Sequence, residues 1–200
     1  MTPDVAPGAR FPDFRLPDHA GRERSLSELQ GDDPMILVLS RGHYCPKDQR
    51  QHRNLVELWP ELKVGYTRLV TISTSSQLET NEWRDGLGAQ WPFLCDTRRE
   101  VQRALDIREY TDPQHNPMVP HTLVLGPGLE VFRIYVGYWY WGRPSNEELR
   151  HDLRELTRRI RPDWDITVSE QREAWQRGER DRFWPYGKTL REVFSQGDLH

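Results

Sequence analysis

Residues 35–46 read MILVLSRGHYCP, and this stretch decides the fold. Its first five residues are apolar without a break, which is typical of a short central strand buried on both faces. A loop then leads to Cys45, and Pro46 stands next to it. Proline already has the φ angle that the first residue of a helix needs. The stretch therefore predicts a buried strand, a loop and a helix that begins at Cys45-Pro46.

The predicted helix changes character along its length. Its second half carries an apolar stripe at helical spacing, which ends near Pro60 and consists of Leu55, Leu58, Trp59 and Leu62. Its first half, residues 47–54, is wholly polar. We therefore do not expect this helix to pack on a sheet over its entire length.

Further strands and helices alternate downstream of this helix. In chain order they are strand 69–73, helix 76–87, strand 91–94 and helix 97–105. The turn Gly126-Pro127-Gly128 then predicts a hairpin of residues 121–125 and 129–137. Alternation followed by a hairpin predicts an α/β fold with a mixed central sheet flanked by helices.

The end of the chain differs from the rest. Ser145 and Glu148 form the capping box of a last helix, which runs to about Ile160. We expect a domain over residues 1–161 and a C-terminal helical extension over 162–200, with short helices at 170–176 and 188–194. The aromatic run Tyr138-Trp139-Tyr140-Trp141 has three interpretations: a surface covered by the extension, a dimer surface, or an apolar substrate pocket.

Composition excludes several classes of protein. The 200 residues carry a net charge of −3, whereas a dedicated nucleic-acid binder normally has a basic face. No apolar stretch approaches the roughly 18 residues of a membrane span. The first eight residues lack the basic and apolar segments of a secretory signal, and two cysteines are too few for a disulfide scaffold. We expect a cytoplasmic protein that binds neither nucleic acid nor membrane.

Five short motifs occur in the order in which the peroxiredoxin superfamily has them. They are residues 8–16 with 25–29, residues 41–46 with Gln51 and Arg53, residues 71–73, residues 93–96 and residues 119–122. The second is similar to the Arg-Gly-x-Trp-Cys-Pro of the peroxiredoxin-like branch, which the chain resembles over residues 8–160. The resemblance implies a thioredoxin-like fold, with a cis peptide bond at Val119–Pro120 beside the cysteine.

Three positions depart from the family pattern. Typical peroxiredoxins have Thr or Ser three residues before the cysteine and Pro seven residues before it, where this chain has Gly42 and Val38. The peroxiredoxin-like branch often has a second cysteine three residues after the first, where this chain has Asp48. These departures exclude thioredoxin-style exchange through a Cys-x-x-Cys pair and remove part of the usual peroxide site.

Cys45 is the candidate reactive residue. The thiolate is the nucleophile, and the N-terminus of a helix together with the cations Arg41 and Lys47 favours it. Asp48 opposes this effect if its carboxylate faces the sulfur. Reaction with peroxide would give a sulfenic acid that a second thiol resolves. The competing interpretation is that Cys45 is a small buried residue without chemistry.

Other candidate residues surround Cys45 in the predicted fold. Cys95 ends a strand on the same rim of the sheet, so it is either the resolving thiol or a conservative Ser-to-Cys replacement in the core. Tyr44 takes the position of the family's Trp, and His43 either orients substrate or is incidental. The residues expected to line the site are Gly42, His43, Tyr44, Pro46, Asp48, Gln51 and Pro120.

The sequence thus predicts a thiol-dependent oxidoreductase. It would reduce hydrogen peroxide or an organic hydroperoxide through Cys45, assisted by Arg41, and an external thiol would regenerate it. A redox sensor or thiol-disulfide partner is one alternative, and a non-catalytic thioredoxin-fold binding module is another. We expect no metal and no cofactor, and a homodimer is compatible with the aromatic run.

Overall fold

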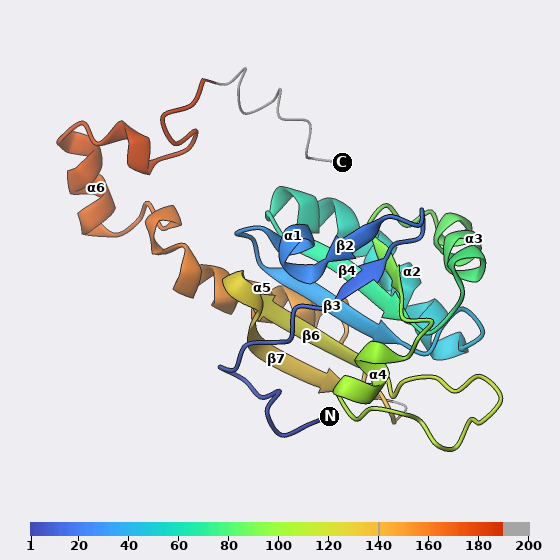
Figure 1. The fold of residues 1–200 in the computed structure, drawn as a ribbon. Helices are drawn as coiled ribbons and strands as arrows, with labels where there is room; N and C mark the ends of the chain where they lie inside the picture. Colours follow the sequence, from blue (N-terminus) through green and yellow to red (C-terminus); the bar gives the residue numbers. More distant parts are fainter. Residues whose placement is uncertain (140, 190–200) are drawn as a thin grey trace. The chain divides into compact units, whose positions relative to one another are not determined.

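The computed structural model describes residues 1–139 and 141–189 (Figure 1). Their contacts divide the chain into two units, residues 1–153 and the residues from Arg154 onward. The described part of the chain has no helix that is long and apolar enough to cross a membrane.

A five-stranded mixed sheet forms the centre of the first unit. Its strands are β3 (Met35–Ser40), β4 (Arg68–Ser73), β5 (Phe93–Cys95), β6 (His121–Gly126) and β7 (Glu130–Val136). Their order across the sheet is β5-β4-β3-β6-β7, and β3, β4 and β5 are parallel. Strand β6 runs antiparallel to both of its neighbours. Every residue of β3 is buried, as the unbroken apolar run predicts.

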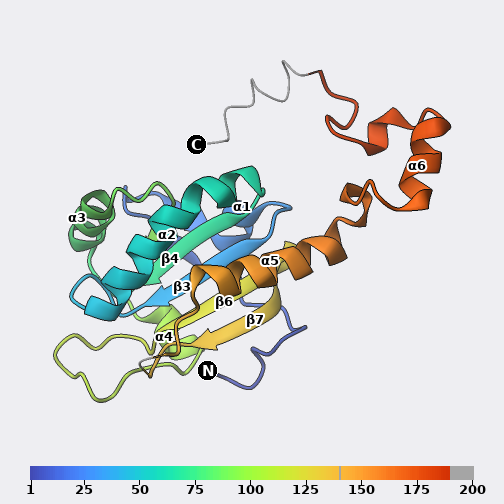
Figure 2. The same ribbon diagram turned by 180° about the vertical axis from the view of Figure 1, so that it is seen from behind.

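Helices lie on both faces of this sheet. They are α1 (Leu26–Gln30), α2 (Pro46–Val64), α3 (Gln77–Leu87), α4 (Glu100–Ala104) and α5 (Asn146–Ile160). Figure 1 shows α1 and α4 in front of the sheet, and Figure 2 shows α2 and the beginning of α5 in front of the opposite face. A small antiparallel pair, β1 (Arg15–Pro17) and β2 (Glu23–Ser25), precedes α1. The predicted α/β fold, with a mixed sheet flanked by helices, is confirmed.

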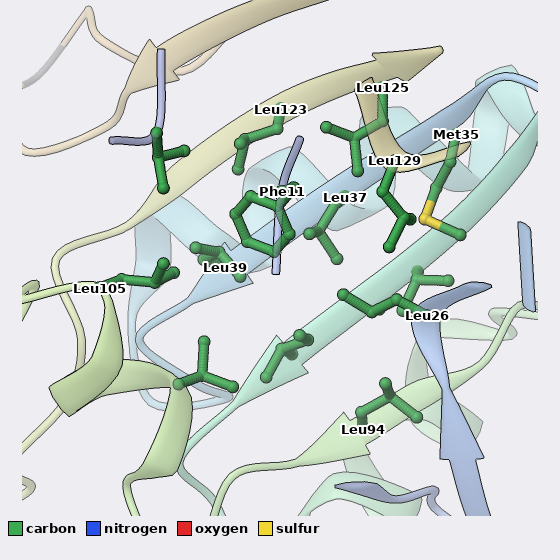
Figure 3. Close-up of a cluster of buried hydrophobic side chains, with 14 of the residues drawn as sticks. Phe11, Leu26, Met35, Leu37, Leu39, Leu94, Leu105, Leu123, Leu125 and Leu129 are labelled. Carbon is green, nitrogen blue, oxygen red and sulfur yellow. The ribbon is translucent and has the colours of Figure 1, made fainter. Parts of the chain in front are cut away.

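The main hydrophobic core lies between the sheet and the N-terminal segment. Alternate residues of β3 point into it, and side chains of α1, β5, β6 and the segment around Phe11 surround them (Figure 3). Ten of its residues are Phe11, Leu26, Met35, Leu37, Leu39, Leu94, Leu105, Leu123, Leu125 and Leu129. Full burial of such a side chain is worth about 1.5–3 kcal/mol, so this core holds β3 in place. The loop that carries Cys45 therefore leaves from a rigid strand.

Helix α2 differs from its prediction at both ends. It continues past Pro60 to Val64, because Leu62 is buried and keeps the last turn against the sheet. In its polar first half Asp48, Gln51 and His52 are also buried, so the helix packs on the sheet over its entire length. These three polar side chains can be buried because each of them is hydrogen-bonded within the protein.

The second unit contains short helices after the end of α5. They are η2 (Pro162–Trp164), α6 (Ser169–Gln176) and η3 (Arg180–Arg182). Phe183 packs edge-on against Trp175 with ring centroids 5.3 Å apart, and the Arg180 guanidinium lies 3.7 Å from the Trp175 ring. The helix predicted at 170–176 is present, whereas the one at 188–194 lies mostly outside the described residues, as does Tyr140. Packing of the extension on the aromatic run stays a prediction.

Candidate active site

Cys45 is the N-cap residue of α2, as the sequence predicts, and only 2% of it is exposed. Its amide donates to the Gly42 carbonyl at 3.2 Å, and its own carbonyl accepts from the Gln49 amide at 2.9 Å. Its side chain makes no capping hydrogen bond, and Pro46 occupies the first helical position. The thiol therefore stands at the positive end of a 19-residue helix.

Arg143 is the residue that the structure adds to this site. Its Nη2 lies 4.0 Å from Sγ of Cys45. The same guanidinium donates from Nε and Nη2 to Oδ1 of Asp48, with the Nε contact at 2.9 Å. Nη1 donates to the Gly137 carbonyl at 2.8 Å. A fixed cation thus faces the sulfur from the loop that follows β7.

Asp48 is fully buried, and its carboxylate is satisfied on both oxygens. Oδ2 accepts from the Ser40 hydroxyl at 3.1 Å and from the Arg41 amide at 2.9 Å, while Oδ1 accepts from Arg143. A buried charge is tolerated only when it is paired and hydrogen-bonded. The Asp48 carboxylate in α2 is therefore hydrogen-bonded to the end of β3, to Arg143, and to the cysteine loop, which consists of residues 41–45.

Arg41 lies on the opposite flank of the cysteine loop. It forms ion pairs with Glu109 at 2.8 Å and with Asp112 at 2.9 Å, and its guanidinium lies 5.6 Å from the Tyr44 ring. Burial alone would lower the pKa of Arg41, but nearby Glu109, Tyr44 and Cys45 raise it. Arg41 thus stays positively charged beside Cys45, and it is ion-paired with the carboxylates of Glu109 and Asp112 at the same time.

The loop of residues 108–118 contacts the cysteine loop through the side chain of Tyr44. The Tyr44 ring stacks on His115 with centroids 3.8 Å apart, and its hydroxyl donates to Asp112 at 3.4 Å. Burial raises the pKa of Tyr44, so this side chain stays a neutral donor. Tyr44 packs where the family has Trp, and in doing so it ties the 108–118 loop to the site.

Gly42 and His43 complete the cysteine loop. Gly42 has φ of +121°, and a Cβ atom there would lie 2.8 Å from the Ser75 hydroxyl, so only glycine fits. The His43 carbonyl accepts from Gln49 at 2.6 Å. His43 also lines a groove of about 410 Å³ between α2 and α3, whose other lining residues are Gln49, Arg53, Glu79, Glu82, Trp83, Gly86 and Leu87.

A buried chain of polar groups supports the first turns of α2. His52 bonds the Asp48 carbonyl through Nδ1 at 2.8 Å and the Thr71 hydroxyl through Nε2 at 3.1 Å. Trp91 donates to the same hydroxyl at 3.0 Å, and Gln51 donates to Thr122 at 2.8 Å. Burial lowers the pKa of His52 to about 4, although Asp48 acts in the opposite direction. A neutral His52 donates from Nδ1 and accepts at Nε2, which satisfies both contacts.

The predicted cis bond at Val119–Pro120 is wrong. That bond is trans, and the cis bond found among the described residues is Trp184–Pro185. The chain runs extended into β6: the Val119 amide donates to Ile107 at 2.6 Å, and the Pro120 carbonyl accepts from Gly137 at 2.8 Å. No tight turn is needed there, so the more stable trans isomer is kept. Pro120 is buried below the loop that carries Arg143.

Cys95 lies at the end of β5 with 1% of its surface exposed. Burial raises the pKa of its thiol, and a hydrogen bond with Thr80 offsets part of that effect. Both cysteines are free thiols. These surroundings favour the interpretation of Cys95 as a core residue, while a resolving role stays untested.

A comparison with known protein families adds a test that is independent of this geometry. The profile of the AhpC/TSA family matches residues 7–132. The chain belongs to the AhpC/TSA family. Thiol-disulfide oxidoreductase ResA of Bacillus subtilis (strain 168) is 22% identical over 153 residues, which cover 76% of each protein. The 1-Cys peroxiredoxin of Onchocerca volvulus is 27% identical over 96 residues, 48% of this chain and 41% of that protein.

A solved structure agrees with the fold of this AhpC/TSA protein. Peroxidoxin BcpB from Mycobacterium tuberculosis superposes with a TM-score of 0.63 at 21% identity, over 75% of this chain and 95% of BcpB. The part matched by the AhpC/TSA profile contains Cys45, Asp48, Arg41 and Pro120 but ends before Arg143. Arg143 therefore lies outside the residues that the family profile matches.

Four residues around the cysteine were not predicted from the sequence: Glu109, Asp112, His52 and Arg143. The loop of residues 108–118 has no hydrophobic periodicity from which the position of its acidic residues beside Arg41 could be predicted. For His52, the i, i+4 spacing from Asp48 was a usable signal, because it puts both side chains on one helix face. Arg143 follows Cys45 by 98 residues, and only the pairing of β7 with β6 brings it to the sulfur.

Proposed function

We propose that this AhpC/TSA protein is a thiol-dependent peroxidase whose reactive residue is Cys45. Its substrate is hydrogen peroxide or an organic hydroperoxide, and an external thiol is its reductant. The observation that carries the proposal is a buried thiol at a helix N-terminus with the Arg143 guanidinium 4.0 Å from Sγ. Donors and a fixed cation at this place stabilise a thiolate and the negative charge that develops on the departing oxygen.

The proposed reaction has two stages. The Cys45 thiolate attacks one peroxide oxygen, so that an S–O bond forms and the O–O bond breaks. The other oxygen leaves as alkoxide or hydroxide and takes up the proton that the thiol released, giving an alcohol or water. An external thiol then displaces water from the sulfenic acid, and a second thiol releases Cys45 as the external disulfide forms.

A second candidate is thiol-disulfide exchange, which the similarity to ResA supports. Asp48 stands three residues after Cys45, so a Cys-x-x-Cys pair is absent and the exchange would need an external second thiol. Reduction of a disulfide substrate without any reaction with peroxide would favour this candidate. We also propose that the protein acts in the cytoplasm, where a reducing environment would keep Cys45 available as a thiol.

Trapping the sulfenic acid tests the proposed function. One equivalent of peroxide followed by dimedone should add a single label to the Cys45 peptide. Cys45→Ser should abolish both the label and peroxide consumption with a thiol reductant, and Cys95→Ser should keep the label. A label confined to Cys95 would reverse the two roles, and no label at either thiol would refute the proposal.

A further inference from the structure

A charged groove lies beside the cysteine loop, between α2 and α3. Its volume is about 410 Å³, and it meets the cysteine loop at His43. Neither Arg41 nor Arg143 is among its lining residues, so it is separate from the place where those cations face Cys45. The proposed reaction of Cys45 with peroxide leaves this groove without a role.

We infer that the groove binds the external thiol that regenerates Cys45. The ligand that fits its charges is a small zwitterionic peptide thiol, whose carboxylate pairs with Arg53 and whose ammonium group pairs with Glu82. The inference rests on the proposed function of Cys45. It deepens that function by naming the chemical class of the reductant and the place where it binds.

One wall of the groove continues the row of α2 residues that begins at Cys45. Gln49 and Arg53 follow Cys45 at intervals of four residues, so all three lie on one face of the helix. The rise of an α-helix puts Arg53 about 12 Å along the axis from Cys45, and helical side chains lean towards the N-terminus. Gln49 donates to the His43 carbonyl at 2.6 Å, which closes the groove at the cysteine loop. A ligand held by Arg53 therefore extends towards the reactive thiol.

The groove carries two charges that have no partner within the described residues. Arg53 in α2 and Glu82 in α3 are exposed, and neither side chain forms a hydrogen bond or an ion pair there. Glu79, the other acidic residue of the groove, is already bonded to Ser76 in the capping box of α3. A ligand with one anionic and one cationic group would therefore pair with Arg53 and Glu82 together.

Two nitrogen atoms in the walls of the groove also lack an acceptor. Nδ1 of His43 and Nε1 of Trp83 are buried and have no hydrogen-bond partner within the described part of the chain. Buried polar groups of native proteins are nearly always hydrogen-bonded, so each exception calls for an explanation. A peptide in the groove carries carbonyl and carboxylate oxygens, which can accept from these nitrogens once the side chains turn towards it.

The chemistry of Cys45 requires a thiol in this ligand. Asp48 stands three residues after Cys45, so no second cysteine of a Cys-x-x-Cys pair can reduce the sulfenic acid. In the proposed step the bound thiol gives up its proton and forms an S–S bond with Cys45. The hydroxide that leaves the sulfenic acid takes up this proton and departs as water. An extended tripeptide spans about 10 Å, which is close to the separation of Arg53 and Cys45 along α2.

Single-turnover reduction of the Cys45 sulfenic acid tests the inference. The full chain is oxidised with one equivalent of hydrogen peroxide and mixed either with glutathione, a zwitterionic peptide thiol, or with 2-mercaptoethanol, a small neutral thiol. Arg53→Gln and Glu82→Gln should each slow the reaction with glutathione by about fivefold, since an exposed charge pair is lost. The rate with 2-mercaptoethanol should not change.

Arg50→Gln and Glu57→Gln are the matched controls. Arg50 and Glu57 are exposed residues of α2 that do not line the groove, and their loss changes the net charge in the same way. Both control variants should keep the natural rate with glutathione. Equal slowing with the two thiols, equal slowing in the control variants, or an unchanged glutathione rate in Arg53→Gln overturns the inference. So does a loss confined to oxidation by an organic hydroperoxide, which would assign the groove to the substrate.

Binding of S-methylglutathione to the reduced chain separates this inference from the proposed function. This probe has no thiol, and the measurement needs no peroxide. NMR spectroscopy follows the indole N–H signal of Trp83, which the Trp83→Phe variant identifies. The signal should shift on titration, and the shift at a given concentration should be smaller in Arg53→Gln. A chain that forms no sulfenic acid but shows this shift loses only the proposed function, whereas a missing shift overturns the inference whatever the reaction with peroxide.

Discussion

At the scale of single residues, the two thiols of this chain lie in different surroundings. Both are almost fully buried, but Cys45 stands at a helix N-terminus between Arg41 and Arg143, whereas Cys95 stands at a strand end beside Thr80. Burial raises the pKa of Cys95, because the thiolate would lose its hydration without gaining a cation. Burial alone therefore does not distinguish a reactive cysteine from an inert one; the charged neighbours do.

This contrast predicts selective alkylation. At pH 7 and with substoichiometric iodoacetamide, we expect the label on Cys45 to exceed that on Cys95 by at least about tenfold, since only the thiolate reacts. Peptide mass spectrometry measures the two labels in the same sample, so each thiol is the other's control. Equal labelling, or a label mainly on Cys95, would contradict the assignment of Cys45 as the reactive thiol.

At the scale of elements, helix α2 shows what the sequence could and could not predict. The Cys-Pro start of the helix and the buried strand before it follow from local chemistry, and both predictions are confirmed. The burial of Asp48 and His52 was not predicted, because periodicity counts apolar residues and a polar residue inside the core looks like an exposed one. Their partners Arg143 and Thr71 lie 95 and 19 residues away along the chain and on other elements, so only the fold brings the hydrogen-bonding groups together.

The buried His52 predicts how stability depends on pH. Its pKa falls from 6.5 to about 4 on folding, because burial disfavours the charged ring. The unfolded chain therefore binds the proton between these values, and the folded state loses stability as the pH falls from 6.5 towards 4. A shift of this size corresponds to roughly 3 kcal/mol.

Urea denaturation at a series of pH values tests this prediction. His52→Gln keeps hydrogen-bonding capacity but does not titrate, so its free energy of unfolding should fall less than that of the natural protein over this window. The carboxylates titrate in both proteins. The pH dependence of the difference between their free energies of unfolding therefore reports on His52 alone. A constant difference from pH 7 to pH 4 would contradict the role given to the ring.

At the scale of the whole molecule, local motifs predicted the family and the central sheet, but not the conformation of every connection between the strands and helices. The five motifs in order placed the chain in the superfamily to which the AhpC/TSA match assigns it. The cis bond expected at Val119–Pro120 is absent because the chain enters β6 without a turn. The edge of the site depends on the loop of residues 108–118 and on Arg143, whose ion pairs follow no sequence period.

The extension leads to a prediction about the full chain. Trp139, Trp141, Trp175 and Trp184 are each at least half exposed within the described structure, and burial of such side chains on each other or on a second copy would be stabilising. We predict that a chain truncated after Ile160 has a lower Tm and a greater tendency to aggregate. Differential scanning fluorimetry and sedimentation velocity measure both. An unchanged Tm would assign the exposed aromatic residues to a partner or an apolar substrate.

The measurement that tests the central claim most directly is the second-order rate constant of Cys45 with hydrogen peroxide. Single-turnover oxidation of the reduced full chain, followed by rapid quench and mass spectrometry of the sulfenic acid, gives this constant without any external reductant. The account predicts a rate at least about 100-fold above that of free cysteine in the same buffer, since fixed donors at a developing charge are worth this much. Cys45→Ser should show no oxidation at this position. A Cys45 that reacts no faster than free cysteine would contradict the assignment of this site as a peroxidase centre.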